Sequence, residues 1–219
     1  LFSRGFIKTG LGKRIAYNLI AAFGSSSLRL AYALALSDLI LAPATPSNTA
    51  RVGGVIMPIT TSLAKAFGSE PQDGPRKIGS FLMQSIYQVN TITSAMFQTS
   101  MAGNTLVAAL ALQSFGIGIT WGDWAMAAIV PGVIALIVMP YFIYKVYPPE
   151  IKDAREAQQM IKEELKGLGK MSFQEWVMLG VFVLALVLWA TSQFTKIDAT
   201  TVAFLGISIL LATSVLVWD

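Results

Sequence analysis

Residues 30–67 read LAYALALSDLILAPATPSNTARVGGVIMPITTSLAKAF, which is two apolar segments separated by a polar break at Ser47-Asn48-Thr49. Pro43 and Pro46 stand just before the break. Two prolines so close together cannot lie inside one regular helix, because proline lacks an N–H group and disfavours helical geometry in the residue before it. The stretch is therefore predicted to form two helices joined by a polar tip.

The composition of the chain indicates a membrane protein. Of its 219 residues, 54% are hydrophobic and 13% are charged, and the mean hydropathy is +0.62. Soluble domains typically carry about 25% charged residues, so we expect an all-α integral membrane protein. Irregular backbone inside a membrane is tolerated only where it is buried in protein or lines an aqueous cavity. The tip at residues 47–49 is therefore a candidate binding site.

Cysteine and histidine are both absent from the sequence. Their absence excludes thiol chemistry, disulfides, Cys/His metal sites and a Ser-His-Asp triad. The sequence also places no pair of carboxylates on one membrane face for acid–base catalysis, so we predict that the protein is not an enzyme. The net charge of +4 comes from basic residues in loops and in an amphipathic arm. This is the distribution that the positive-inside rule expects, and nucleic-acid binding is not predicted.

The apolar and polar segments divide the chain into predicted regions. They are an amphipathic interfacial arm (1–27), a re-entrant hairpin with the Ser-Asn-Thr tip (28–67), a broken transmembrane helix (77–115), a transmembrane helix (124–147), a cytoplasmic linker helix (148–172), another transmembrane helix (173–194) and the start of a further, truncated transmembrane helix (199–219). The chain begins without Met and ends within an apolar run, so we expect a fragment of a longer protein.

The predictions for the hairpin and for the arm rest on the length of the first and the charge pattern of the second. The first limb of the hairpin has about 13 residues and spans roughly 20 Å as a helix, which is short of the ~30 Å hydrocarbon core, so the hairpin is predicted to be re-entrant. The arm alternates apolar and basic residues, which suits the headgroup region of an anionic leaflet. Packing of the arm on the neighbouring helices is an equal alternative.

A second break is predicted at residues 100–105, where the sequence reads SMAGNT. Gly103 followed by Asn104 weakens a helix interior, and the apolar helix resumes at Leu106. Polar residues before this break recur near helical spacing and are predicted to face the bundle or a cavity, namely Gln84, Gln88, Thr91 and Gln98. A pair of interrupted membrane helices is the best sequence indication of a transporter site.

The chemistry of the first tip follows from the ends of its two half-helices. The unpaired carbonyl groups of the first limb, with the oxygens of Ser47 and Asn48, suit a small cation, and the unpaired N–H groups of the second limb, with Asn48 and Thr49, suit a carboxylate. The alternative is that these residues only cap the second limb. Asp38 and Arg51 are predicted to pair across the hairpin, with a contact between Arg51 and a dianionic substrate as the second choice.

The run Ala42-Pro43-Ala44-Thr45-Pro46-Ser47-Asn48-Thr49-Ala50-Arg51 resembles the divalent anion/sodium symporter family, most closely its branch of 2-oxoglutarate/malate and citrate/succinate translocators. Residues 4–12 and 98–104 fit the same branch. The resemblance implies a fragment of an inverted-repeat elevator transporter, usually a homodimer through a scaffold domain, with one re-entrant hairpin and one unwound transmembrane helix. It implies a secondary transporter that moves dicarboxylates with sodium across a bacterial inner membrane, or alternatively a plastid inner envelope.

The resemblance also implies roles for individual residues. Sodium would be bound at Ser47 and Asn48 with Thr45 and Gly103, and the substrate would be bound by Asn48, Thr49, Ala102 and Asn104. The expected partners are a dicarboxylate, sodium as the coupling ion and the lipid bilayer, with no other cofactor. Related symporters have a serine ligand where this chain has Pro43, and the second break lacks their Gly-Thr-Gly-Pro-Asn form. A sodium-independent dicarboxylate exchanger and a non-transporting structural subunit are therefore kept as alternatives.

Overall fold

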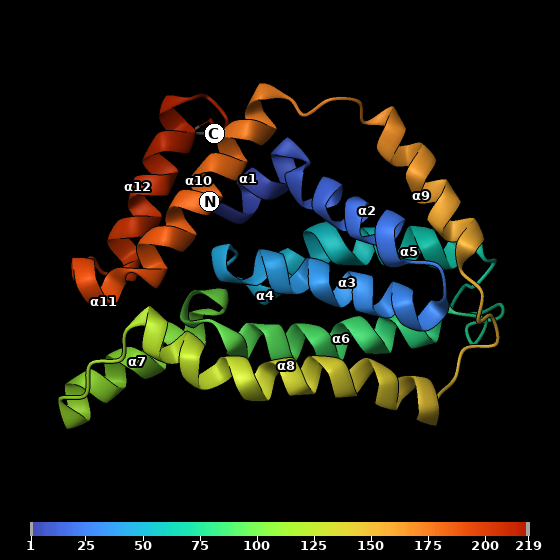
Figure 1. Cartoon of the computed structure of the whole chain (residues 1–219), viewed down its shortest axis with the longest axis horizontal. Helices are drawn as coiled ribbons and strands as arrows, with labels where there is room; N and C mark the ends of the chain where they lie inside the picture. The colour runs from blue at the N-terminus through green and yellow to red at the C-terminus, as the bar shows by residue number, and fades with distance from the viewer. Residues whose placement is uncertain (1, 218–219) are drawn as a thin grey trace.

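The computed structural model describes residues 2–217, which form helices joined by short turns and loops (Figure 1). The helical segments are α1 (Phe2–Thr9), α2 (Leu11–Phe23), α3 (Ser27–Leu41), η1 (Ala42–Ala44), α4 (Asn48–Arg51), η2 (Val52–Ile56), α5 (Met57–Ala66), α6 (Gly79–Met96), η3 (Gln98–Ser100), α7 (Ala102–Phe115), α8 (Trp121–Val146), α9 (Arg155–Gly167), α10 (Phe173–Ala190), α11 (Ser192–Thr195) and α12 (Ala199–Ala212). The prediction of an all-α protein is confirmed for the described residues.

Helices α3, α6 and α8 pack side by side, with α8 along one edge of the molecule (Figure 1). At one end, Ser27 N donates to Lys152 O (3.0 Å) and Ile151 N donates to Lys77 O (2.9 Å), so the starts of α3 and α6 are neighbours. Both helices run away from this end and are interrupted at the other. This parallel course brings the two interruptions together, which decides where the candidate site lies.

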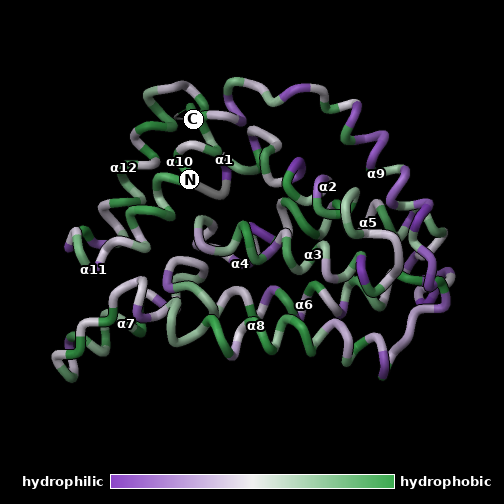
Figure 2. Tube along the Cα trace, viewed as in Figure 1, coloured by the Kyte–Doolittle hydropathy of each residue, from purple (hydrophilic) through white to green (hydrophobic). Residues whose placement is uncertain are grey.

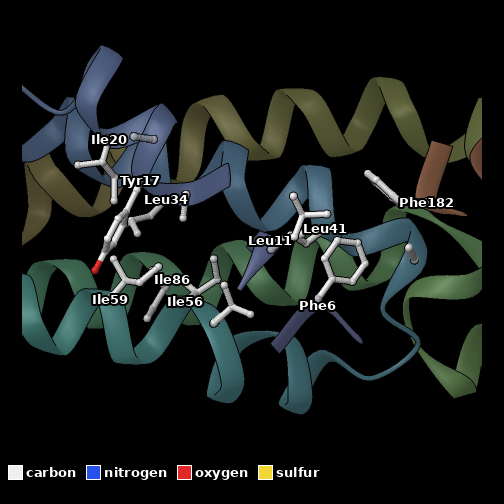
Figure 3. Packing of buried hydrophobic residues seen from close by; sticks show 14 of the residues in the cluster. Phe6, Leu11, Tyr17, Ile20, Leu34, Leu41, Ile56, Ile59, Ile86 and Phe182 are labelled. Atoms are coloured by element: carbon white, nitrogen blue, oxygen red, sulfur yellow. The ribbon is translucent and has the colours of Figure 1, made fainter. Parts of the chain in front are cut away.

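The arm consists of two helices that meet at Gly10, whose φ of +77° lies in the left-handed region that glycine adopts without strain. Its apolar side chains point toward those of the hairpin, as Figure 3 shows for Tyr17 and Leu11. Phe6 packs edge to face on Phe182 of α10, with ring centroids 5.4 Å apart. The apolar side of the arm therefore packs on neighbouring helices.

Three helices are long and apolar enough to cross a membrane among the residues described, namely Ser27–Ala44, Trp121–Val146 and Phe173–Ala190. The first of them is 18 residues long, so the first limb of the hairpin is longer than the predicted 13 residues. Helix α8 consists mostly of hydrophobic residues (Figure 2) and exposes large side chains such as Val130, Ile137 and Phe142, which is what a lipid-facing helix needs. Helix α12 ends at Ala212, before the end of the predicted segment 199–219, whose last two residues lie outside the described part.

The polar linker helix α9 runs back along the arm and is held at both ends (Figure 1). Near its start, Gln158 donates to Ala21 O (2.8 Å). At its other end lies a cluster that we call the Arg14 centre, made of the Arg14 side chain, the Glu175 carboxylate and the carbonyl groups of Leu168, Gly169 and Lys170. This centre joins the arm, the end of α9 and the start of α10.

Candidate functional site

The first helix break follows from the prolines predicted to cause it. Helix α3 ends at Leu41 and passes into the short turn η1 (Ala42–Ala44), which contains Pro43. The backbone is then extended at Thr45 and Ser47 before α4 begins. Ser47 caps α4, because its Oγ accepts a hydrogen bond from Ala50 N at 3.2 Å. The capping interpretation is therefore correct for Ser47, and it leaves open what else the tip binds.

The second break lies at residues 97–101, three residues earlier than the 100–105 predicted, because α7 already begins at Ala102. Asn104 explains the shift. Its Nδ2 donates to Ser94 O (2.7 Å) and to Phe97 O (2.9 Å), so it satisfies carbonyl groups at the end of α6 from inside the first turn of α7. Ser100 Oγ also donates to Ser94 O (2.6 Å).

Direct hydrogen bonds join the two breaks. Thr99 Oγ1 in η3 donates to Pro43 O in η1 at 2.5 Å, and Trp121 Nε1 of α8 donates to Thr99 Oγ1 at 2.9 Å. Arg51 Nη1 donates to Thr45 O of the first break (3.3 Å) and to Ser100 O of the second (3.4 Å). Two regions far apart in the sequence therefore form one polar junction, beside the label α4 in Figure 1.

Arg51 and Asp38 pair across the hairpin, as predicted, with Nε to Oδ1 at 2.8 Å. Nη2 of Arg51 donates to three side chains of α6, which are Asn90 (3.0 Å), Thr93 (3.1 Å) and Ser94 (3.0 Å). Thr93 Oγ1 also donates to Asp38 Oδ2. We call this set the Arg51 centre: Arg51, Asp38, Asn90, Thr93, Ser94 and the carbonyl groups of Thr45 and Ser100.

The polar face predicted for α6 is not the face that meets the hairpin, although Gln98 of that set is buried and donates to Ile119 O (3.2 Å). The face turned to the hairpin carries Asn90, Thr93 and Ser94, whose spacing of three and four residues was a usable signal. Gln84 is exposed and lies with Gln88 in a pocket of about 570 Å³ beside α8.

The predicted site residues all lie at or next to the two breaks. Among the tip residues, Ser47 and Asn48 are half-buried and Thr49 is exposed. Asn48 Oδ1 accepts from Thr49 N at 2.8 Å. Thr45 is buried, and its hydroxyl donates to Leu41 O at 2.7 Å. In the part of the chain that the structure describes, no hydrogen bond joins residues 47–49 to residues 102–104.

Ala102, Gly103 and Asn104, the site residues predicted on α7, differ in the groups that they can present to a ligand. Ala102 and Gly103 lie in the first turn of α7, a 14-residue helix, where backbone N–H groups lack partners within the helix and favour an anion. Asn104 is buried, and both N–H groups of its amide are directed at carbonyl oxygens, so only its Oδ1 is left to meet a ligand. In this arrangement Asn104 holds the break and does not donate to a carboxylate.

The junction offers neutral oxygens and N–H groups as its binding chemistry. No cluster of three or more His, Cys, Asp or Glu residues that suits a metal ion occurs within residues 2–217. A cation at the tip would therefore depend on neutral side-chain and backbone oxygens, as alkali and alkaline-earth cations prefer oxygen over sulfur. A carboxylate would be met by the starts of α4 and α7, which both begin at the junction.

Comparison with known proteins identifies the family to which this chain belongs. Residues 1–219 match the family described as the sodium:sulfate symporter transmembrane region. The chain is 53% identical over 218 residues to the putative malate transporter YflS of Bacillus subtilis (strain 168), which covers 99% of this chain and 46% of that protein. This chain belongs to the sodium:sulfate symporter family. The resemblance found in the sequence is therefore confirmed.

Other members of the sodium:sulfate symporter family show similar agreement. Dicarboxylate transporter 1, chloroplastic, of Spinacia oleracea is 48% identical over 218 residues, covering 99% of this chain and 38% of that protein. The inner membrane protein YbhI of Escherichia coli (strain K12) is 48% identical over 217 residues, covering 99% of this chain and 45% of that protein. The chain spans less than half the length of these relatives. Two of them are named as transporters, in agreement with the prediction of a non-enzymatic protein.

Proposed function

We propose that this chain supplies one half of the substrate site of a membrane transporter for dicarboxylates such as malate, 2-oxoglutarate and succinate. The observation that carries the proposal is the junction of two helix breaks in an integral membrane protein, with Ser47-Asn48-Thr49 at one break and the start of α7 at the other. The names of the relatives, a putative malate transporter and chloroplast dicarboxylate transporters, supply the substrate class.

The proposed roles follow the chemistry of each group. Asn48 and Thr49 bind one carboxylate of the substrate, together with the backbone N–H groups at Ala102 and Gly103. Asn104 supports the site without binding the substrate, because its amide group donates to carbonyl groups on the other side of the second break. The remaining contacts to the substrate come from parts of the transporter beyond this chain, which the relatives' greater length provides.

Sodium coupling is proposed for Ser47 and Asn48, with the carbonyl groups around Thr45 and Gly103 as further ligands. One observation favours the second candidate, a sodium-independent dicarboxylate exchanger. The carbonyl groups of Thr45 and Ser100 already accept hydrogen bonds from Arg51, which makes their oxygens weaker ligands for a sodium ion. We further propose an elevator mechanism, a homodimer, and a bacterial inner membrane or a plastid inner envelope as the location.

The experiment uses the full-length transporter reconstituted in liposomes that are preloaded with malate. Uptake of labelled 2-oxoglutarate is followed with and without an inward sodium gradient. Uptake that requires sodium and survives the removal of internal malate supports symport, and uptake that requires malate but ignores sodium supports exchange. A transporter that takes up no dicarboxylate in either condition refutes the proposal and favours the structural subunit.

A matched pair of variants localises the activity to the tip. Asn48→Ala is expected to lower uptake at least about a hundredfold, because it removes the one side chain assigned to both the cation and the carboxylate. Asn18→Ala makes the same chemical change on the exposed face of the arm and is expected to leave uptake unchanged. Equal uptake by the two variants would remove the tip from the site.

A further inference from the structure

Arg51 is one of the most deeply buried large side chains in the molecule. The residue is 1% exposed, and its guanidinium group contacts four different segments. These are the first limb of the hairpin through Asp38, the first break through Thr45 O, helix α6 through three polar side chains and the second break through Ser100 O. An arginine with so many partners is well suited to hold segments at fixed distances.

A count of N–H groups shows that Arg51 has none left for a substrate. A guanidinium carries five N–H groups. Among the described residues, the Nε–H group donates to Asp38 and the Nη1 group donates to the carbonyl groups of Thr45 and Ser100. The two hydrogens of Nη2 are shared by the three acceptor side chains of α6. Because Asp38 pairs with it, the charge of Arg51 is also compensated locally. The second choice of the sequence analysis, a contact between Arg51 and a dianion, does not fit this geometry.

The position of Arg51 Nη1 shows how the side chain connects the two breaks. This one nitrogen bridges a carbonyl group of the first break and a carbonyl group of the second, at 3.3 and 3.4 Å. The rest of the guanidinium is fixed by Asp38 on one side and by the α6 side chains on the other. The rigid plane of the guanidinium therefore spans the two breaks, beside the direct hydrogen bond from Thr99 Oγ1 to Pro43 O.

We propose that Arg51 is a positioning residue of the transport site, which holds the hairpin tip and the α6–α7 break at one fixed spacing and does not touch the substrate. The inference rests on the proposed function, since the site whose geometry it fixes is the proposed dicarboxylate site. Binding groups on two separate breaks must keep their distance within a fraction of an ångström to act on one small ligand. The two interrupted helices would then move as a single body.

Lysine cannot replace Arg51 in this role. Its ammonium group has three donors on a flexible stem and no planar fork, so it cannot reach Asp38, both carbonyl groups and the α6 side chains at once. Arg51→Lys keeps the positive charge and is therefore the informative variant. Arg14→Lys is a matched control, because it makes the same change in the Arg14 centre, which shares no hydrogen bond with the Arg51 centre among the described residues.

The experiment combines transport by the full-length protein with hydrogen exchange of its backbone amides. For Arg51→Lys we expect the apparent KM to rise about tenfold for malate, succinate and 2-oxoglutarate alike, since a displaced break weakens every ligand that spans it. We also expect faster amide exchange in both residues 45–49 and residues 97–101, measured without substrate. Arg14→Lys should change neither quantity.

Two results would overturn the proposal. One is an Arg51→Lys transporter with the wild-type KM. The other is a loss of transport while both segments exchange as in the wild type, because the guanidinium would then act on the substrate itself. A merely structural role lowers the amount of folded transporter, and hence the maximal rate, but leaves the KM of the folded fraction unchanged.

A milder variant keeps the test decisive if Arg51→Lys does not fold. Thr93→Val removes one acceptor of Arg51 and one donor to Asp38 while nearly keeping the side-chain shape. It should raise the KM by a smaller factor and speed exchange in the same two segments, and no change in either would contradict the proposal. A wild-type protein that transports no dicarboxylate would refute the proposed function, whereas the exchange data would still test the positioning role.

Discussion

The Arg51 centre and the Arg14 centre use the same chemistry for different purposes. Each places one arginine against one carboxylate and several backbone carbonyl groups. In the Arg51 centre the side chains of the ion pair are 0% and 2% exposed, whereas those of Arg14 and Glu175 are 12% and 7% exposed. The first is enclosed between membrane helices, and the second lies where the arm, the linker and α10 meet.

The partners of each arginine explain the difference. Arg51 contacts carbonyl groups that two helix breaks leave unpaired, so it stabilises the irregular backbone that forms the site. Arg14 contacts the carbonyl groups at the end of α9, and its partner Glu175 also caps α10 by accepting from Ser172 N at 2.7 Å. On this proposal the Arg51 centre fixes the geometry of the candidate binding site, whereas the Arg14 centre joins connecting helices outside it. The following variants test that distinction.

The largest effect is expected from Asp38→Ala. The substitution leaves the Arg51 guanidinium buried without its counter-charge, and removing one partner of a buried ion pair costs about 3–5 kcal/mol. The full-length transporter should therefore unfold at a clearly lower temperature in detergent, and the fraction that folds should show a raised KM. Asp38→Asn should recover part of the loss because the amide oxygen still accepts from Arg51 Nε. Normal stability of Asp38→Ala would show that the pair is dispensable.

A smaller effect is expected from Arg14→Ala. Its carbonyl partners lie at the surface and can exchange a lost hydrogen bond for water, and Glu175 keeps its hydrogen bond from Ser172 N, so the cost is about 1–3 kcal/mol. Because the Arg14 centre holds connecting helices, the KM for dicarboxylates should stay at the wild-type value. The check is thermal unfolding combined with uptake kinetics of the full-length protein. An Arg14→Ala transporter with a raised KM would contradict the division of roles between the two centres.

The hairpin and its ion pair could be predicted because their signals are local. Pro43 and Pro46 decide where α3 ends, whatever packs around them. Asp38 and Arg51 are both costly in an apolar setting, so their pairing followed from the cost of leaving either alone. For the same reason the tip Ser-Asn-Thr could be placed at a helix start from sequence.

The partners of Arg51 on α6 share a helical spacing in the sequence, but that spacing alone does not decide which polar face of α6 turns toward the hairpin. Polar residues occur on two faces of this helix, and only the packing of α3 decides that Asn90 and Thr93 face inward while Gln84 faces outward. The exact second break was also missed. Asn104 satisfies the end of α6 from across the break, so Gly103 is tolerated inside the first turn of α7.

The smallest effect is expected at a third arginine, Arg155, whose pairing with Asp153 at 2.5 Å lies at the surface with side chains 75% and 55% exposed. The hydrogen bond from the Arg155 side chain lowers the pKa of Asp153 from 3.8 to about 2. A carboxyl group with a lowered pKa contributes stability that is present above its ordinary pKa and is lost as the pH falls through the lowered one. That window lies between about pH 4 and pH 2.

Because the pair is exposed, Asp153→Asn should lower the unfolding temperature of the full-length transporter only slightly between pH 5 and pH 8 and should leave its uptake unchanged. Both groups stay charged in the wild type across that range, and an exposed ion pair contributes little because water and salt screen it. The measurement is a pH series of unfolding temperatures for the wild type and the variant. Curves that lie far apart above pH 5 would show that an exposed pair stabilises the protein as much as the Arg14 and Arg51 pairs do, and burial would no longer explain the ranking of the three arginines.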